Sequence, residues 1–444
     1  MRRNVALDRY LKRHIETGLP DCPEPGEEWQ HTLVVPAYRE APGMLARLRR
    51  LPPGPGRTLV ILVLNRPDSD PDEEANHALR EALGPLPPSE NCALKPDGPH
   101  ISALNPQTDL YCHDMERLQG PCPQAQGVGL ARKTGFDIAL KWMSEGGIRD
   151  GWICSTDADA QLPGDYFLRL QNTADIATCL PFWHAPGSDP GCNRATALYE
   201  LRLHHYVLGL DYARSPYAWH SLGSCLAVRA DAYAQVRGFP RRAGGEDFYL
   251  LSKLAKVGRI ATPGGACIAL QSRDSQRVPF GTGPAVTKIG AARDPMSLPL
   301  YYHPGCFEAL RAVLDALPQM RQATLAGLPA LLAARGLDAP MQRACCNVLE
   351  SLGLPEALAH CRRQGRTPDQ FLRQFHQWFD AFRTLKFIHR LRAAGWPDQP
   401  LASVQQLAPP FWPATMEAMS APEEFCQAVR DYRGWVTGDV RPRW

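Results

Sequence analysis

Short apolar runs alternate with amphipathic segments along the first half of the chain. The runs at 32–35, 58–64 and 152–156 have the length of buried strands, and the segments at 42–51 and 128–143 have the spacing of helices. Further elements expected in this half are a helix at 72–83 and a strand at 109–113. Strands that alternate with helices indicate βαβ units. The pattern therefore predicts an α/β fold with a mainly parallel sheet and helices on both faces.

The pattern changes after residue 159. Segments 175–182, 221–228 and 259–270 read as strands, and segments 193–212 and 245–257 read as helices. This order continues the α/β region to about residue 300.

The last third of the chain is helical in pattern, after a loop expected at 271–299 from its Gly and Pro residues. Its clearest helix begins at Thr367 as N-cap, with Pro368 in the first turn and Gln370 as the partner of a capping box. An apolar stripe then continues until Gly395 ends the helix. We therefore predict an N-terminal extension over 1–30, an α/β domain over 31–300 and a helical region over 301–444.

Composition and charge exclude several classes of protein. Apolar residues make up 44% of the 444 residues and charged residues 21%, which is ordinary for a globular protein with a large core. The net charge of +3 comes without a block of like charge, so a nucleic-acid partner is not expected. The fourteen cysteines contain no Cys-x-x-Cys spacing. No segment is apolar enough for an integral membrane helix or a signal peptide. We expect a reduced, cytoplasmic protein.

The most informative residues are Asp157 and Asp159, which follow the strand predicted at 152–156. Carboxylates at i and i+2 of an extended chain point to the same side. Such a pair can hold a hard divalent cation, which keeps waters or substrate phosphates as its other ligands. The sequence therefore predicts a metal site for Mn²⁺ or Mg²⁺ here.

Four further motifs lie at 34–40, 127–135, 246–247 and 273–283. Together with Asp157 and Asp159 their order resembles the GT-A-fold glycosyltransferases, particularly the large family 2, over roughly residues 30–305. The first is the segment 34–40, similar to the family's opening strand and turn. The resemblance implies that Pro36, Tyr38 and Glu40 border the nucleoside, and that Asn65 at the end of the second strand lies near the base.

The second motif, at 127–135, looks like the family's Gly-x-x-x-Ala-Arg-Asn-x-Gly helix start, with Lys133 in place of Asn. A dinucleotide fingerprint is rejected here, because Arg132 stands where its third glycine should be. Arg132 and Lys133 in a first helical turn are expected to face a diphosphate.

The third motif is Glu246-Asp247, preceded by segments that resemble the acceptor half of family 2 enzymes. The resemblance implies that one of these acids is the catalytic base. An acceptor hydroxyl must lose its proton as it attacks the anomeric carbon, and a helix N-terminus favours an ionised carboxylate. We assign Asp247 as the base and Glu246 as a group that orients it or binds acceptor.

The fourth motif is a basic loop at 273–283, from which Arg277 is expected to bind the leaving diphosphate. His303 follows it, at a place similar to one from which some GT-A enzymes take a metal ligand. The loop departs from the Gln-x-x-Arg-Trp box of processive synthases, which argues against a polymerase.

These motifs together predict a GT-A-like, Rossmann-like nucleotide-diphospho-sugar transferase domain. The expected reaction is metal-dependent, inverting, non-processive transfer of a sugar from a UDP- or GDP-sugar to an acceptor hydroxyl. The acceptor class stays open among carbohydrate, lipid and small molecule, and peripheral contact with a membrane is compatible with the sequence. Alternatives are a retaining GT-A enzyme, a sugar nucleotidyltransferase and a non-catalytic nucleotide-sugar binding module.

Overall fold

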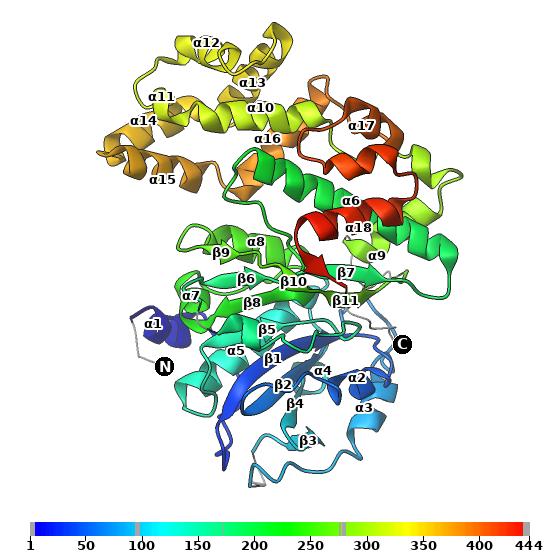
Figure 1. Cartoon of the computed structure of the whole chain (residues 1–444). Helices are drawn as coiled ribbons and strands as arrows, with labels where there is room; N and C mark the ends of the chain where they lie inside the picture. The colour runs from blue at the N-terminus through cyan, green and yellow to red at the C-terminus, as the bar shows by residue number, and fades with distance from the viewer. Residues whose placement is uncertain (1–4, 94–97, 172, 275–276, 278–280, 438–444) are drawn as a thin grey trace. The chain divides into compact units, whose positions relative to one another are not determined.

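The computed structural model describes residues 5–93, 98–171, 173–274, 277 and 281–437. The chain forms two compact units (Figure 1). The first unit consists of Met1–Asn193, Ser221–Thr287 and Arg433–Trp444, and the second of Arg194–His220 and Lys288–Tyr432. The chain therefore leaves the first unit twice and returns to it twice.

The first unit is built on an eight-stranded sheet with the order β3-β4-β2-β1-β5-β8-β6-β9. Strands β4, β2, β1 and β5 are parallel, β9 is parallel to β6, and β3 and β8 run antiparallel to their neighbours. The bounds are β1 Trp29–Ala37, β2 Arg57–Leu64, β3 Ile101–Asn105, β4 Thr108–Asp114, β5 Trp152–Ser155, β6 Ala177–Cys179, β8 Leu226–Arg229 and β9 Ile260–Ala261. The predicted α/β class with a mainly parallel sheet is confirmed.

The central strands β1 and β2 are buried along nearly their whole length. Parallel strands covered on both faces need apolar side chains on both, which explains the continuous apolar runs in the sequence. Helix α5 (Gly127–Ser144) packs against β1, β2 and β5. A Cβ atom at Gly135 would lie 2.4 Å from Val34 Cγ1, so glycine lets this helix approach the sheet closely.

The remaining elements of the first unit are short. Two small parallel sheets pair β7 (Phe182–Ala185) with β11 (Ile268–Gln271), and β10 (Gly265–Ala266) with β12 (Trp435–Val436). Its short helices are α1 Val5–Arg13, α2 Met44–Leu48, α3 His77–Leu83, α4 Met115–Gln119, α7 Ala230–Gln235 and α8 Glu246–Leu254.

The second unit is helical, and the predicted C-terminal helical region is confirmed. Helices α6 (Pro190–Tyr212) and α9 (Thr282–Gly290) contain the two positions at which the chain leaves the first unit. The other helices are α10 Pro304–Asp315, α11 Leu317–Met320, α12 Leu328–Ala333, α13 Ala339–Ser351, α14 Leu354–Gln364, α15 Pro368–Trp378, α16 Ala381–Ala393, α17 Leu401–Leu407 and α18 Pro422–Tyr432.

The helix predicted from Thr367 begins as expected but ends early. Thr367 and Gln370 form the capping box on α15. The single helix expected to run to Gly395 is wrong, because α15 ends at Trp378 and α16 begins at Ala381. Asp380 lies between them and its side chain accepts a hydrogen bond from the Arg383 N–H at 3.1 Å, capping a new helix. The apolar stripe continues across this break because both helices bury one face.

Several other predicted elements are divided or shorter in the structure. The strand expected at 175–182 is two strands, β6 and β7, and the one at 259–270 is three, β9, β10 and β11. The loop expected at 271–299 contains helix α9. Runs of apolar residues do not show where the chain leaves one sheet for another. The boundaries of these strands therefore depend on hydrogen-bond pairing between strands, which the sequence pattern does not reveal.

Candidate active site

The candidate site lies at the carboxyl ends of β1 and β5. From β1 the chain builds β2 and β4 on one side of the sheet, and it later places β5 on the other side of β1. In open α/β sheets ligands bind at the carboxyl ends of strands where the order reverses in this way. The segment 38–40 follows β1 and the segment 156–159 follows β5, so the sheet brings two predicted motifs to one edge.

An acidic cluster occupies this edge. Burial raises the pKa of Asp159 to about 6; Arg273 opposes this effect, and the nearby Asp157 and Glu40 add to it. Burial likewise raises the pKa of Glu40, against the effect of Arg273 and with that of Asp157. Because neighbouring carboxylates disfavour the ionised forms of Asp159 and Glu40, a cation at this edge would stabilise them.

Two arginines of the predicted basic loop supply positive charge to this cluster. Arg273 lies 2.7 Å from Asp159 Oδ2 and 3.3 Å from Glu40 Oε1. Arg277 pairs with Glu40 and donates to the Tyr38 carbonyl at 3.2 Å. Arg277 was predicted for this site and Arg273 was not, although both lie in the same basic motif. Residues 275–276 and 278–280 of that motif lie outside the described residues.

The turn between Asp157 and Asp159 is held by an arginine that the sequence did not reveal. Arg47 on α2 donates two hydrogen bonds to the Ala158 carbonyl, at 3.0 Å and 2.7 Å. This contact fixes the backbone between the two aspartates, so their side chains keep a defined spacing. An isolated arginine in a short amphipathic helix carries no sequence signal for such a role.

Arg132 connects the two halves of the site. Its guanidinium lies 2.5 Å from Asp157 Oδ1 and 2.9 Å from Glu246 Oε1, and it donates to Ser155 Oγ at 2.7 Å. It is 4% exposed, and a Cβ atom at Gly223 would lie 2.6 Å from it. Glycine at 223 therefore makes room for Arg132, which bridges two carboxylates in this structure. Its contact with a diphosphate stays a prediction.

Asp247 is the second carboxyl group of the Glu246-Asp247 motif. It lies in the first turn of α8, after Gly245 at φ +66°, and its Oδ1 accepts from the Phe248 N–H at 2.6 Å. Burial raises the pKa of Asp247 to about 7, and Glu246 adds to this effect while the Phe248 N–H and Arg132 oppose it. Glu246 is buried against Arg132, which leaves Asp247, partly exposed, as the acid that a ligand can reach.

Lys133 lies in a different cluster from Arg132. Its Nζ is 2.5 Å from Asp137 Oδ2 and 3.3 Å from Glu16 Oε1, and it donates to the Tyr10 hydroxyl at 3.0 Å. Lys133 is 5% exposed and Asp137 is fully buried. The lysine therefore fastens the N-terminal segment to α5, away from the position that the diphosphate prediction gave it.

Replacing Lys133 by Met is expected to destabilise the protein by about 3–5 kcal/mol, because it leaves the Asp137 carboxylate buried without its cation. Lys141→Met on the same helix is the matched control. Lys141 pairs with Asp21, whose side chain is 93% exposed, and solvent screens such a pair so that its loss has little effect on stability. Urea unfolding of both variants measures the difference, and equal losses would contradict this account.

The other predicted residues have structural partners as well. The Tyr38 hydroxyl donates to Asp70 Oδ2 at 2.5 Å, and the Asn65 carbonyl accepts from Asn76 Nδ2 at 3.0 Å. Pro36 is buried within β1. His303 belongs to the second unit, where its Nδ1 accepts from the Gly305 N–H at 3.0 Å and caps α10.

The carboxylates of Asp157 and Asp159 have the donor chemistry that a divalent ion requires. Asp157 and Asp159 offer the oxygen ligands that Mn²⁺ and Mg²⁺ prefer, and the Asp157 side chain is 38% exposed. Within the described part of the chain, no three His, Cys, Asp or Glu side chains are arranged to hold a metal by themselves. A bound ion would therefore need ligands from water or from a substrate.

Comparisons with known proteins give distant structural matches. No protein-family model and no curated protein sequence matches the chain. The fold is similar to that of S. aureus TarS 1-349 in complex with UDP, at 10% identity and a TM-score of 0.34, over 80% of this chain and 91% of that one. It is also similar to the mannosyltransferase PcManGT from Pyrobaculum calidifontis, in complex with GDP-Man and Mn²⁺, at 16% identity and a TM-score of 0.35, over 97% and 94% of the two chains.

Both matches are at low identity and cover most of this chain. The α/β class itself follows from the strand pairings of the first unit. Among the described helices, none is both long and apolar enough to cross a bilayer.

Proposed function

We propose that the chain is a glycosyltransferase that moves a sugar from a nucleoside-diphosphate sugar to an acceptor hydroxyl. The observation that carries this proposal is the pairing of an acidic, arginine-lined edge at β1 and β5 with a carboxyl group of raised pKa at Asp247, linked through Arg132. The first part suits a metal-bound diphosphate, and the second suits proton removal from an acceptor.

The donor would bind with its nucleoside near Tyr38 and its diphosphate near Arg277. Asp157 and Asp159 would hold Mn²⁺ or Mg²⁺, which supplies Lewis-acid stabilisation of the diphosphate. Arg273 and Arg277 pair with Glu40 in this structure, and they are close enough to the same edge to stabilise charge on the leaving group.

Asp247 would take the proton of the acceptor hydroxyl as its oxygen bonds to the anomeric carbon. The bond from that carbon to the diphosphate breaks, and the diphosphate leaves with the electron pair. Attack from the face opposite the diphosphate inverts the anomeric centre, through a transition state of oxocarbenium character. We further propose a non-processive reaction, since the basic loop lacks the motif of the processive synthases.

Thermal stability against a panel of nucleoside diphosphates tests the donor site. A nucleotide at about 100 times its Kd is expected to stabilise the protein by about 2.7 kcal/mol, a shift of several degrees in Tm, with Mn²⁺ present and not without it. Asp157→Ala/Asp159→Ala should abolish the shift, because it removes the metal's protein ligands.

The matched control is Glu73→Ala/Glu74→Ala, which removes two exposed acids outside the site. It should keep the full shift. A wild-type protein that no nucleotide stabilises with any metal would refute the donor site. Release of pyrophosphate instead of a nucleoside diphosphate would indicate a nucleotidyltransferase, and binding without turnover a non-catalytic module.

A further inference from the structure

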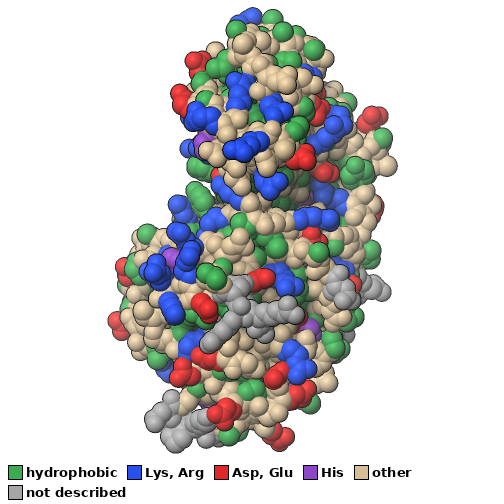
Figure 2. All heavy atoms as spheres, turned by 90° about the vertical axis from the view of Figure 1, so that its left-hand side faces the viewer, with side chains coloured by type: hydrophobic (Ala, Val, Ile, Leu, Met, Phe, Trp, Pro, Cys, Tyr) green, Lys and Arg blue, Asp and Glu red, His purple; other side chains and the backbone are tan. Residues whose placement is uncertain are grey.

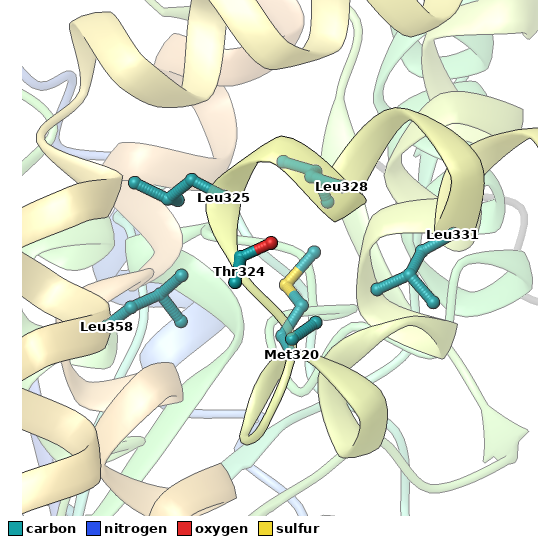
Figure 3. Close-up of a pocket in the computed structure, with 7 residues that line it drawn as sticks. Met320, Thr324, Leu325, Leu328, Leu331 and Leu358 are labelled. Atoms are coloured by element: carbon teal, nitrogen blue, oxygen red, sulfur yellow. The ribbon is translucent and has the colours of Figure 1, made fainter.

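The second unit carries an apolar hollow that the proposed reaction does not use. It lies between α11, α12 and α14, is partly open to solvent, and has a free volume of about 10 Å³, which is room for about one water molecule. Figure 3 shows the side chains of Met320, Leu325, Leu328, Leu331 and Leu358 around it. Leu325 is 43% exposed, so the apolar surface continues from the hollow to the outside.

Arginines surround this hollow. Arg362 donates to the carbonyl groups of Met320 and Ala323, which both line it, at 2.6 Å and 2.5 Å. Arg321 donates to the Arg366 carbonyl at 2.7 Å, which brings the turn after α14 to the same place. Arg363 follows Arg362 on α14 and is exposed. We call Arg321, Arg362, Arg363 and Arg366 the arginine rim.

The arginine rim has no acidic partners. Within the part of the chain that the structure describes, none of its four guanidinium groups forms an ion pair with a carboxylate. Residues 321–392 contain eleven Lys and Arg against five Asp and Glu, although the whole chain has a net charge of only +3. Figure 2 shows several Lys and Arg side chains on one face of the helical unit, and others on the rest of the molecule. The segment 321–392 is therefore basic, and hydrogen bonds place Arg362, Arg321 and the backbone of Arg366 beside the hollow.

We propose that this face docks on an anionic lipid surface. Basic side chains next to the headgroups and an apolar side chain directed into the acyl boundary are the two features that hold a protein on such a surface. A nucleic acid would be attracted by the arginines alone and would gain nothing from an exposed Leu325, so the apolar hollow favours lipid. The proposal concerns the second unit only and does not depend on the proposed transfer reaction.

Sedimentation of the full chain with vesicles tests the proposal. Vesicles of phosphatidylcholine with about one third phosphatidylglycerol are expected to bind the protein, and pure phosphatidylcholine vesicles are not, with binding that weakens as salt increases. Arg363→Gln/Arg366→Gln should weaken binding at least about tenfold, since each basic residue contributes about 1 kcal/mol at an anionic surface. Leu325→Asp should weaken it comparably by placing a negative charge at the apolar contact.

Two matched controls separate this face from general effects of charge and polarity. Arg49→Gln/Arg50→Gln removes the same charge from exposed arginines of the first unit, and Leu407→Asp alters a leucine that is 47% exposed on α17. Both should bind vesicles like wild type, and all variants should keep the wild-type Tm. Absence of vesicle binding, or equal losses in the controls, would overturn the proposal. Single-stranded DNA that binds with the same affinity and is insensitive to Leu325→Asp would replace the lipid by a nucleic acid.

Discussion

Replacing Asp247 by Asn is expected to reduce sugar transfer about a thousandfold while the metal-dependent binding of the nucleotide remains. The amide keeps the size of the side chain but cannot take a proton from the acceptor, and a general base typically contributes a factor of about 10² to 10⁴. The rate of nucleoside-diphosphate release with acceptor present, together with the thermal shift by the nucleotide, measures the two effects separately. Activity that survives in Asp247→Asn would favour a retaining mechanism.

Asp231→Asn is the matched control for this substitution. Asp231 also lies in the first turn of a helix, and its Oδ1 accepts from the following N–H at 2.9 Å, as Asp247 does at 2.6 Å. Its side chain is 47% exposed and outside the site. The rate of sugar transfer by Asp231→Asn should equal that of wild type. A similar loss of transfer in Asp231→Asn and Asp247→Asn would point to a defect of helix capping.

The pH dependence of stability and activity gives a second test of the role of Asp247. The pKa of Asp247 is raised to about 7 in the folded state, above its ordinary value of 3.8. Between these values the folded protein holds a proton that the unfolded chain has lost, so the stability that this group contributes decreases as the pH rises toward 7. Wild-type activity should rise through the same range, because the base acts when it is ionised. Asp247→Asn should therefore be more stable than wild type at pH 8 and equal to it near pH 4.

Replacing Arg132 by Met is expected to destabilise the protein by about 3–5 kcal/mol and to abolish nucleotide binding. The substitution leaves Glu246, which is 4% exposed, without its counter-charge at 2.9 Å, and breaking one side of a buried ion pair has this magnitude. It also frees Asp157, whose position the same guanidinium fixes. Chemical unfolding gives the stability, and the thermal shift gives the binding.

The double variant Arg132→Met/Glu246→Gln separates the two consequences. In the double variant a neutral amide replaces the Glu246 carboxylate, so no uncompensated charge is buried. Most of the lost free energy of unfolding should therefore return. Nucleotide binding should stay weak, because Asp157 still lacks its partner. A double variant as unstable as the single one would show that Arg132 supports the fold through packing and not through its ion pair.

The sequence could predict which end of the sheet carries the acidic groups. Glu40 and Asp159 follow apolar runs that were predicted as strands of a mainly parallel sheet, and the carboxyl ends of parallel strands lie at one edge. That β1 and β5 are neighbours in this sheet is known only from the structure. The α/β class and the capping box at Thr367 were likewise readable, since both depend on local spacing.

What the sequence could not provide are contacts between residues far apart in the chain. Arg132 meets Glu246 across 114 residues, and Arg47 meets Ala158 across 111. Lys133 is different, because Asp137 follows it by four residues on a predicted helix, and that spacing favours an ion pair. This local signal competes with the family resemblance, and the structure follows the local signal. The arginine rim joins Arg321 to Arg366 and has no sequence signature for the same reason as Arg132.

The short strand β12 has a consequence for how the protein can be divided. The Gly265 and Cys267 N–H groups donate to carbonyl groups of Gly434 and Val436, at 2.8 Å each, so the residues after the helices complete a sheet of the first unit. The helical unit is therefore an insertion with both ends anchored, not a tail. A cut near residue 300 removes a strand and exposes the edge of β10, a surface prone to intermolecular pairing. Separating the units calls instead for joining the chain across the two insertion points, Asn193 to Ser221 and Thr287 to Arg433.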